Sequence, residues 1–372
     1  MLVIVHNILA PYRVPLFNEL EQSLDGQLTV VLTRDTHRKR RRWSVPWQDV
    51  SFQVEQLRTA GIAHGGRVFD VSFGVRRMLD QLSPEVVVLG GWDLSASWSS
   101  LRWCHRRAVP AVAWVESGVA TGSFRDPLSS LARQRFLDGC GAALVSGDAA
   151  AAFVKLLRPG LPTTVVHNAI GLSALHALPA PTARSALFVG ELSQRKGVDV
   201  LLEALPGLLQ HLESVVIVGD GQLRSAVADA ARRSERVHYL GYSEGRRLVD
   251  AFASAGVVVA PSRKDPAPLV ASEALAAGRP LVLGPGVGNA DDLRRLSPEA
   301  VSVMTTASAS ELIGSVSKVL GRVVTPAARA AFTPRSCADA YLRGVEICRP
   351  ESRRSGRPSP NGIQMGLREG GP

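Results

Sequence analysis

The sequence has few cysteines and no long apolar run, and each shortage excludes a class of protein. The four cysteines among 372 residues show no C-x2-C spacing, which argues against a zinc site and against a disulfide framework: Cys104, Cys140, Cys337 and Cys348. No stretch approaches 18 consecutive apolar residues, as a transmembrane helix would require. The first residues, MLVIVHNIL, form a strand pattern without a basic segment or a cleavage site. We therefore expect a cytoplasmic protein that is neither exported nor membrane-spanning.

The excess of positive charge is confined to two short segments. Of a formal net charge of +10, residues 34–42 carry a net +5 and residues 349–372 a net +3. The rest of the chain is nearly balanced and has no RNA-binding or zinc-finger motif, so we expect no nucleic-acid partner. The 34–42 segment is followed by Trp43 and Trp47. This segment could bind an anionic membrane surface at the inner membrane face, or it could be a solvated loop.

Short apolar runs alternate with helical patterns along the whole chain, which predicts an α/β protein with doubly wound parallel sheets. The length suits two domains rather than one core. The runs expected to be strands are residues 2–5, 28–33, 86–89, 111–114, 143–146, 164–166, 186–189, 215–218, 237–240 and 256–260. Residues 172–184 have the composition of a linker, and the polar segment after Arg349 has too little apolar surface to order itself.

The stretch from 255 to 283 carries the clearest chemical signal. After the strand at 256–260, Asp265 and Pro266 give a helix start signal, and Gly278-Arg279-Pro280 gives a stop. On one continuous helix, Asp265 and Glu273 would lie about 12 Å apart, roughly the span of a sugar nucleotide from ribose to hexose. Glu273 shares a face with Leu269, an expensive place for a carboxylate unless hydroxyl or amide groups engage it. The alternative for Asp265 is a helix cap and nothing more.

Loops at the carboxyl ends of strands line the ligand crevice of an open α/β sheet, so two loops of the first half are candidates for substrate contact. Tyr12 and Arg13 follow the first strand, and Glu116 follows the strand at 111–114. Glu116 could hydrogen-bond a sugar hydroxyl or cap a turn. Tyr12 could contact substrate or pack internally, and Arg13 could contact substrate or lie on the surface.

In the second half, glycines and basic residues follow the strands in a pattern that suits a diphosphate. Gly190 ends a strand, and Arg195-Lys196-Gly197 precedes a helix whose free N–H groups favour anions. Gly219 follows the next strand, and Tyr242 the one after that. Alone, this spacing fits a surface lysine as well as a phosphate site.

Together these motifs resemble the retaining glycosyltransferases of family 4, which have the GT-B fold of two Rossmann-like domains facing a cleft. Asp265 to Glu273 is similar to the family's D/E-x7-E signature, with Asp where Glu is commoner and Pro-Ala-Pro in place of Gly-aromatic-Gly. Glu191 stands where the family has Arg, and Glu116 where many relatives have His. The resemblance implies that Asp265 contacts the donor sugar and Glu273 the ribose. The donor-binding residues it implies are Gly190, Arg195, Lys196, Gly219, Tyr242, Asp265, Pro268, Leu269, Val270 and Glu273.

The resemblance divides the chain into an acceptor-side domain (1–171), a linker (172–184), a nucleotide-sugar domain (185–331), a returning helix (332–348) and a disordered tail (349–372). It implies transfer of a hexosyl unit from a nucleoside diphosphate sugar, a co-substrate rather than a cofactor, to a glycan or lipid-linked acceptor with retention. Lys196, Asp265 and Glu116 are the expected catalytic residues. No Asp-x-Asp occurs, so no metal is implied.

Two alternatives remain. One is a nucleotide-sugar epimerase on the same fold, with His6, His167 or Glu116 as its acid-base residue. The other is a catalytically silent sugar-nucleotide binder or partner subunit, which the Glu191 replacement and the altered 266–268 loop favour.

Overall fold

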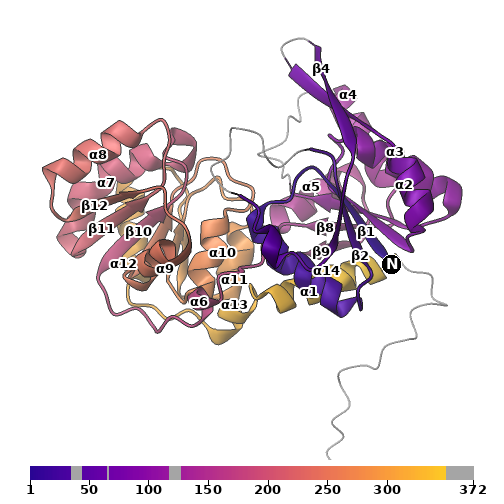
Figure 1. Ribbon diagram of the computed structural model, residues 1–372. Coiled ribbons are helices and arrows are strands. Elements are labelled where there is room, and N and C mark those ends of the chain that lie inside the picture. The colour runs from indigo at the N-terminus through magenta and orange to yellow at the C-terminus, as the bar shows by residue number, and fades with distance from the viewer. Residues whose placement is uncertain (35–43, 65–66, 117–126, 349–372) are drawn as a thin grey trace, which may run out of the picture.

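The structure is a computed structural model that describes residues 1–34, 44–64, 67–116 and 127–348, without the side chains of 62–70. Most of the basic 34–42 segment and the expected tail at 349–372 therefore lie outside the described residues. Two parallel sheets flanked by helices form two Rossmann-like domains (Figure 1), which confirms the predicted fold class. No helix in the described part of the chain is long and apolar enough to cross a membrane.

The N-terminal domain is built on a seven-stranded parallel sheet in the order β3-β2-β1-β6-β7-β8-β9. Its strands are β1 (Leu2–His6), β2 (Leu28–Leu32), β3 (Gln53–Gln56), β6 (Val86–Leu89), β7 (Ala111–Val115), β8 (Ala142–Val145) and β9 (Thr163–Val165). All residues of β1, β2, β6, β7 and β8 are buried, as strands covered on both faces require.

The C-terminal domain contains a six-stranded parallel sheet in the order β12-β11-β10-β13-β14-β15. Its strands are β10 (Ser185–Val189), β11 (Ser214–Val218), β12 (Val237–Gly241), β13 (Val257–Ala260), β14 (Leu281–Leu283) and β15 (Val301–Val303). Numbered within the domain, this order is 3-2-1-4-5-6, that of a dinucleotide-binding Rossmann sheet, which reverses between β10 and β13. Ligands bind such sheets outside the carboxyl ends of the strands, at the point of reversal.

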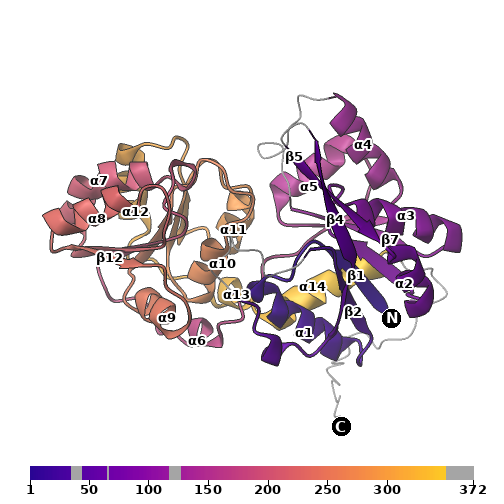
Figure 2. The ribbon, with the colours of Figure 1, turned by 45° about the horizontal axis from the view of Figure 1, so that its top comes forward.

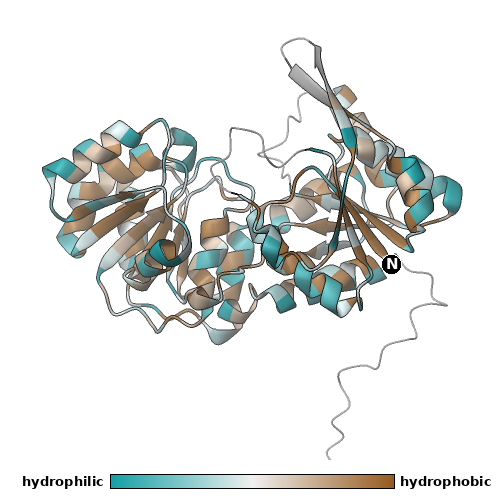
Figure 3. Ribbon diagram, in the orientation of Figure 1, coloured by the Kyte–Doolittle hydropathy of each residue, from teal (hydrophilic) through white to brown (hydrophobic). Residues whose placement is uncertain are grey.

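Helices cover both faces of each sheet (Figures 1 and 2). Those of the N-terminal domain are α1 (Val14–Ser23), α2 (Val75–Leu82), α3 (Ser95–Arg107), α4 (Pro127–Asp138) and α5 (Asp148–Leu157), with the 3-10 turns η1 (Pro11–Arg13) and η2 (Trp47–Asp49). The C-terminal domain contributes α7 (Val198–His211), α8 (Arg224–Arg233), α9 (Gly245–Ala253), α10 (Leu269–Ala276), α11 (Ala290–Leu296), α12 (Ala309–Val319) and α13 (Pro326–Ala330), with the turn η3 (Gln194–Lys196). Hydrophobic residues gather along the strands and on the sheet-facing sides of the helices (Figure 3).

The last helix, α14 (Pro334–Glu346), belongs in space to the N-terminal domain. It packs beside α1 and against β8 and β9, and Tyr341 is buried there with its ring 5.3 Å from that of Trp114. The backbone N–H of Ile170 donates to the carbonyl of Phe332 at 2.9 Å, where the two chain crossings between the domains meet. Residues far apart in sequence thus fix the junction between the domains.

The helix predicted to open at Asp265 begins four residues later, so that prediction is wrong. Pro268 occupies the N-cap position, with φ −63° and ψ 125°, and α10 starts at Leu269. The cause is Pro268, because a proline disfavours helical backbone at the residue before it, here Ala267. The 12 Å separation inferred from a continuous helix for Asp265 and Glu273 therefore does not apply.

Two further elements differ from the sequence analysis. An antiparallel hairpin, β4 (Arg58–His64) with β5 (Arg67–Phe73), projects beside the N-terminal sheet (Figure 1) and was not predicted. The segment expected to be a linker, 172–184, contains a one-turn helix, α6 (Ser173–His176), whose Leu175 is fully buried.

Candidate active site

The carboxyl ends of β10 and β11 meet through two glycines at the point where the strand order reverses. A Cβ atom on Gly219 would lie 1.8 Å from the carbonyl oxygen of Gly190, and Gly219 has φ +141°. A side chain is therefore excluded at Gly219 on both counts. Because neither glycine has a side chain, a ligand beside Gly190 would meet the backbone of Gly190 and Gly219.

Lys196 and Asp265 form an ion pair across this edge of the sheet. Lys196 ends the turn η3 ahead of α7, and Asp265 lies in the loop after β13. The Asp265 carboxylate is buried, and its backbone is fixed by hydrogen bonds with residues of the loop after β14: its N–H donates to Gly286 at 2.9 Å, and its carbonyl accepts from Gly288 at 2.8 Å. Two residues predicted separately as catalytic thus lie in direct contact.

Arg195 lies beside this pair, but its charge is engaged elsewhere. Its guanidinium is 2.7 Å from the Glu191 carboxylate and donates to the carbonyl of Lys264 at 3.1 Å. Arg195 could supply the charge of the arginine that the resembled family has at position 191, but Glu191 itself offsets that charge. Lys196, the other cation of η3, is paired in turn with Asp265.

Glu273 lines a cavity of about 710 Å³ between the two domains. The cavity is also lined by Tyr12 of the N-terminal domain and by Tyr242 and Leu269 of the C-terminal domain. Burial raises the pKa of the Glu273 carboxyl to about 7. A carboxylate so poorly solvated on a cavity wall is suited to accept hydrogen bonds from hydroxyl groups of a ligand.

The other predicted donor-binding residues lie close to this wall in different ways. The Tyr242 hydroxyl donates to Glu244 at 2.9 Å, and its ring is partly exposed. Pro268 caps α10, while the side chain of Val270 packs in the hydrophobic core instead of facing the cavity. Any contact of Val270 with a ligand would therefore have to come from its backbone.

A second cavity, of about 310 Å³, lies at the carboxyl ends of β1, β6 and β7 of the N-terminal sheet. Its lining includes His6, Trp92 and Glu116. The buried Arg13 guanidinium holds Glu116 with a 2.7 Å ion pair and lies 4.3 Å from the centre of the Trp114 ring. The two predicted residues Arg13 and Glu116 thus bind each other, and Oε1 of Glu116 is occupied by this ion pair.

The two histidines of the epimerase alternative are both kept neutral by their surroundings. Burial, with a smaller contribution from Arg13, holds the pKa of His6 well below its ordinary range, and burial lowers the pKa of His167 to about 4. The His167 ring packs 5.2 Å from that of Phe332 at the domain crossing. Within the described ranges, no group of three or more His, Cys, Asp or Glu side chains converges as a metal site.

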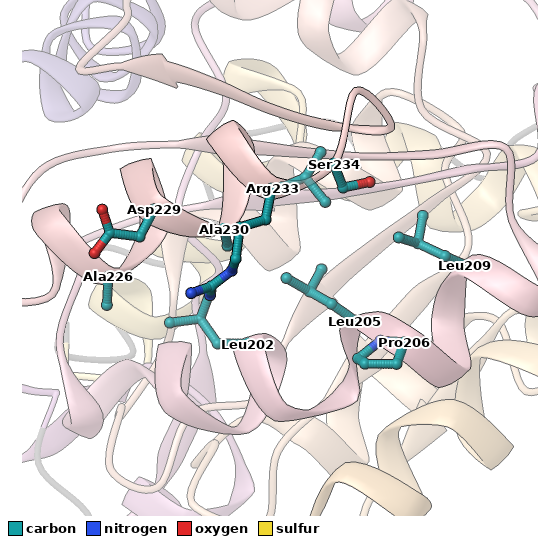
Figure 4. Close-up of a pocket in the computed structure, with 10 residues that line it drawn as sticks. Leu202, Leu205, Pro206, Leu209, Ala226, Asp229, Ala230, Arg233 and Ser234 are labelled. Atoms are coloured by element: carbon teal, nitrogen blue, oxygen red, sulfur yellow. The ribbon is translucent and has the colours of Figure 1, made fainter.

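Figure 4 shows a third pocket, of about 390 Å³, between α7 and α8. Leu202, Leu205 and Leu209 form its apolar wall, with Asp229 and Arg233 beside them. The pocket reaches Val237, the first residue of β12, and so lies at the opposite edge of the sheet from Gly190 and Gly219. This position excludes it as part of the site at the carboxyl ends of the strands.

Several contacts of the site had no signal in the sequence. Lys196 and Asp265 are 69 residues apart, and no local pattern predicts their pairing. Asp292 of α11 accepts a hydrogen bond from the backbone of Asp148 across the cleft, over 144 residues of sequence. Only the rule that loops gather at the carboxyl edge of a parallel sheet could have placed these residues near one another.

Comparison with known proteins identifies relatives of parts of the chain. Residues 183–321 match the family model of the group 1 glycosyl transferases. An uncharacterized glycosyltransferase of Methanocaldococcus jannaschii is 40% identical over 101 residues, which cover 26% of each chain. A phosphatidyl-myo-inositol mannosyltransferase of Mycobacterium leprae is 30% identical over 132 residues, 33% of this chain and 35% of the relative. The matches thus span well under half the length of these curated relatives.

Solved structures match nearly the whole chain at low identity. Anabaena HepE in complex with UDP superposes with a TM-score of 0.67 at 14% identity, covering 93% of this chain and 99% of that one. The lipopolysaccharide outer core galactosyltransferase WaaB gives a TM-score of 0.67 at 12% identity, with 93% and 99% covered. The fold is therefore GT-B, and the family match over residues 183–321 supports a group 1 glycosyltransferase.

Proposed function

We propose that this chain is a retaining family 4 glycosyltransferase that moves a hexosyl unit from a nucleoside diphosphate sugar to an acceptor hydroxyl. The observation that carries the proposal is the placement of two features at the carboxyl edge of the C-terminal sheet, the Gly190–Gly219 approach and the Lys196–Asp265 pair, together with the buried Glu273 on the cavity between the domains. These groups come from the loops after β10, β11 and β13 and from α10, where a Rossmann sheet places its ligand. HepE, which shares the fold, was solved with UDP, and a uridine diphosphate sugar is a suitable first donor to test.

Each residue has a role that its chemistry suits. Departure of the diphosphate develops negative charge, which Lys196, the backbone near Gly190 and the amides that begin α10 at Leu269 would stabilise. Glu273 would accept hydrogen bonds from the ribose hydroxyls. Asp265, oriented by Lys196, would contact the transferred sugar. The proposal includes no metal ion, because the chain has no Asp-x-Asp and the charge of the leaving group is assigned to Lys196.

The acceptor side of the reaction is assigned to the N-terminal domain. Glu116 lies on the 310 Å³ cavity at its sheet edge, and Arg13 orients its carboxylate. In this role Glu116 would hydrogen-bond an acceptor or donor hydroxyl near the reacting carbon. A glycan or lipid-linked acceptor suits a protein whose residues 34–42 are strongly basic, and we propose a cytoplasmic protein that meets it at the inner membrane face.

A catalytically silent sugar-nucleotide binder is the second candidate. The Glu191–Arg195 pair favours it, because a carboxylate beside the diphosphate site opposes the binding charge and leaves fewer cations to stabilise the leaving group.

Incubation with a panel of labelled sugar nucleotides and glycan acceptors separates these functions. Transfer or slow donor hydrolysis supports the proposed enzyme, and the anomeric configuration of the product, read by NMR, tests retention. Interconversion of the sugar without transfer would identify an epimerase. Binding by calorimetry without turnover of any donor would favour the silent binder.

A further inference from the structure

The N-terminus of α5 in the N-terminal domain is capped by a carboxylate from the C-terminal domain. The backbone N–H of Asp148, the first residue of α5, donates to Oδ2 of Asp292 at 2.7 Å. Gly147, the N-cap residue, makes no side-chain cap of its own. Because the first amides of a helix lack partners within the helix and carry partial positive charge, an acidic side chain is the natural group to satisfy them. Here that group comes from α11, on the side of the C-terminal domain that faces the N-terminal domain (Figure 2).

An arginine completes this contact. The Arg295 guanidinium lies 2.7 Å from Oδ1 of Asp292 on its own helix and 2.5 Å from the side-chain carboxylate of Asp148 in the other domain. Asp292 is only 6% exposed, whereas Arg295 and Asp148 remain open to solvent. Burial raises the pKa of the Asp292 carboxyl to about 6, so the ionised form prevails at neutral pH. The contact thus consists of a buried charge with two partners, one of them across the cleft.

The fit between the two helices is also tight. A Cβ atom on Gly147 would lie 2.6 Å from Oδ2 of Asp292 and 2.8 Å from the Cβ atom of Asn289, which precedes α11. Any side chain at Gly147 would therefore push α11 away. The spacing of the two domains at this point is set by direct contact.

The loop that leads into α11 is joined to the candidate donor site. Gly286 and Gly288 exchange backbone hydrogen bonds with Asp265. Added Cβ atoms would lie 1.9 Å from the carbonyl oxygen of Arg263 at Gly286 and 2.6 Å from that of Pro266 at Gly288. The loop that carries Asp265 is therefore joined by hydrogen bonds and close packing to the loop that leads to Asp292.

We propose that Asp292 is an interdomain positioning residue, which caps α5 and thereby holds the Asp265 side of the cleft at a fixed distance from the N-terminal sheet edge. It touches neither donor nor acceptor and acts through the spacing of the two domains. Transfer requires groups from both domains at the correct distance from each other. Loss of this contact therefore lowers turnover more than it lowers donor affinity.

The test compares three substitutions with a matched control. Asp292→Ala removes the cap, Asp292→Asn keeps an oxygen that can accept from Asp148 but removes the charge, and Gly147→Ala introduces a methyl group into the contact. Asp291→Ala is the control, because Asp291 is the adjacent acid on the same helix, is exposed, and pairs with Arg294 of that helix at 2.8 Å. Small-angle scattering measures domain spacing, calorimetry measures donor binding, and thermal unfolding checks the fold.

Asp292→Ala and Gly147→Ala should each increase the radius of gyration and lower kcat about tenfold, with the donor Kd within about twofold of the native value. Asp292→Asn should recover part of the loss, and Asp291→Ala should match the native protein. In the double variant, the effects of Gly147→Ala and Asp292→Ala should not add, because both act at one contact. Unchanged scattering in Asp292→Ala and Gly147→Ala, or equal changes in Asp291→Ala, would overturn the proposal.

The kinetic part rests on the proposed transferase function, but the scattering part does not. If no donor is turned over even by the native chain, the proposed function fails while the domain spacing still decides the role of Asp292.

Discussion

The Lys196 ammonium and the Asp265 carboxylate form an ion pair that joins the loop after β10 to the loop after β13. Both side chains are largely buried, with 19% and 9% of their surface exposed. Removing one partner therefore leaves the other as a poorly solvated charge, and the two residues act as one unit in any substitution experiment. A diphosphate bound at Gly190 would compete with Asp265 for Lys196.

Lys196→Ala should lower turnover more than ground-state donor affinity, because the lysine charge matters most as the diphosphate departs. The neighbouring Lys264, which is exposed, provides the control substitution Lys264→Ala. Steady-state kinetics measure the effect. If KM rises while kcat holds, Lys196 only positions the donor and its role in stabilising the leaving group is wrong.

Glu273→Gln should weaken donor binding by about 1.5–3 kcal/mol, because a charged acceptor for the ribose hydroxyls is lost while the shape is kept. In the native protein, affinity should rise as the pH increases through about 7, since burial raises the pKa of Glu273 to about 7 and the ionised form is the better acceptor. Calorimetry at pH 6 and pH 8 tests both points. Equal affinities for the variant and the native chain would make Glu273 a structural acid.

Without donor, Glu273 should make the stability of the protein fall as the pH rises, which is opposite to the change in donor affinity. Its folded pKa, about 7, lies above the ordinary value of 4.5, so its contribution to stability is present at low pH and is lost as the pH rises through about 7. Glu273→Gln should therefore become more stable than the native chain at pH 8, by up to roughly 3 kcal/mol.

Urea unfolding at pH 5.5 and pH 8 measures this difference, with Glu299→Gln as the control because Glu299 is 79% exposed. A Glu273→Gln curve that runs parallel to the native one across this range would show that burial does not perturb the carboxyl.

Most strands of the two sheets were predictable because they are short apolar runs bounded by glycine or polar residues, and burial on both faces leaves little choice of residue. The edge strand β3 (Gln53–Gln56) was not predicted, because it is mostly polar and is not buried. The start of α10 was predicted wrongly, because Pro268 disfavours helical backbone at Ala267 and so overrides the start signal of Asp265-Pro266. Contacts such as Asp292 with Asp148 depend on how two separately folded domains meet, which local patterns do not encode. The candidate site residues were named from the sequence and stay predictions, but their pairings could not be foreseen.

Arg279 illustrates a buried charge with a structural role, and its loss should destabilise the C-terminal domain. Its guanidinium, 1% exposed, donates to the carbonyl of Phe252 at 2.7 Å, to that of Pro179 at 2.7 Å and to that of Ala253 at 3.4 Å. Arg279→Leu would leave these carbonyls without this donor, at about 1–3 kcal/mol for each one that stays unsatisfied. Urea unfolding should show a loss of about 3 kcal/mol or more.

The exposed Arg246, which pairs with Asp250 on the surface of α9, is the matched control. Arg246→Ala should stay within about 0.5 kcal/mol of the native stability. Equal losses in the two variants would show that the Arg279 hydrogen bonds to Phe252 and Pro179 add nothing to stability.

The last prediction concerns the basic segment, most of which lies outside the described residues. Arg34, Arg38, Lys39, Arg40, Arg41 and Arg42 precede Trp43 and Trp47, and the described Trp47 is 42% exposed on η2. Each basic residue near an anionic surface adds about 1 kcal/mol, and tryptophan favours the interfacial zone. We expect the native chain to sediment with anionic vesicles at low salt, to release them at high salt, and to ignore neutral vesicles.

A chain with Gln at the six basic positions should lose this binding while retaining donor affinity, because the donor site is assigned to the other domain. If both chains bind anionic vesicles equally, or neither binds, the segment is a solvated face of the protein. That outcome would favour a soluble glycan over a lipid-linked molecule as the acceptor.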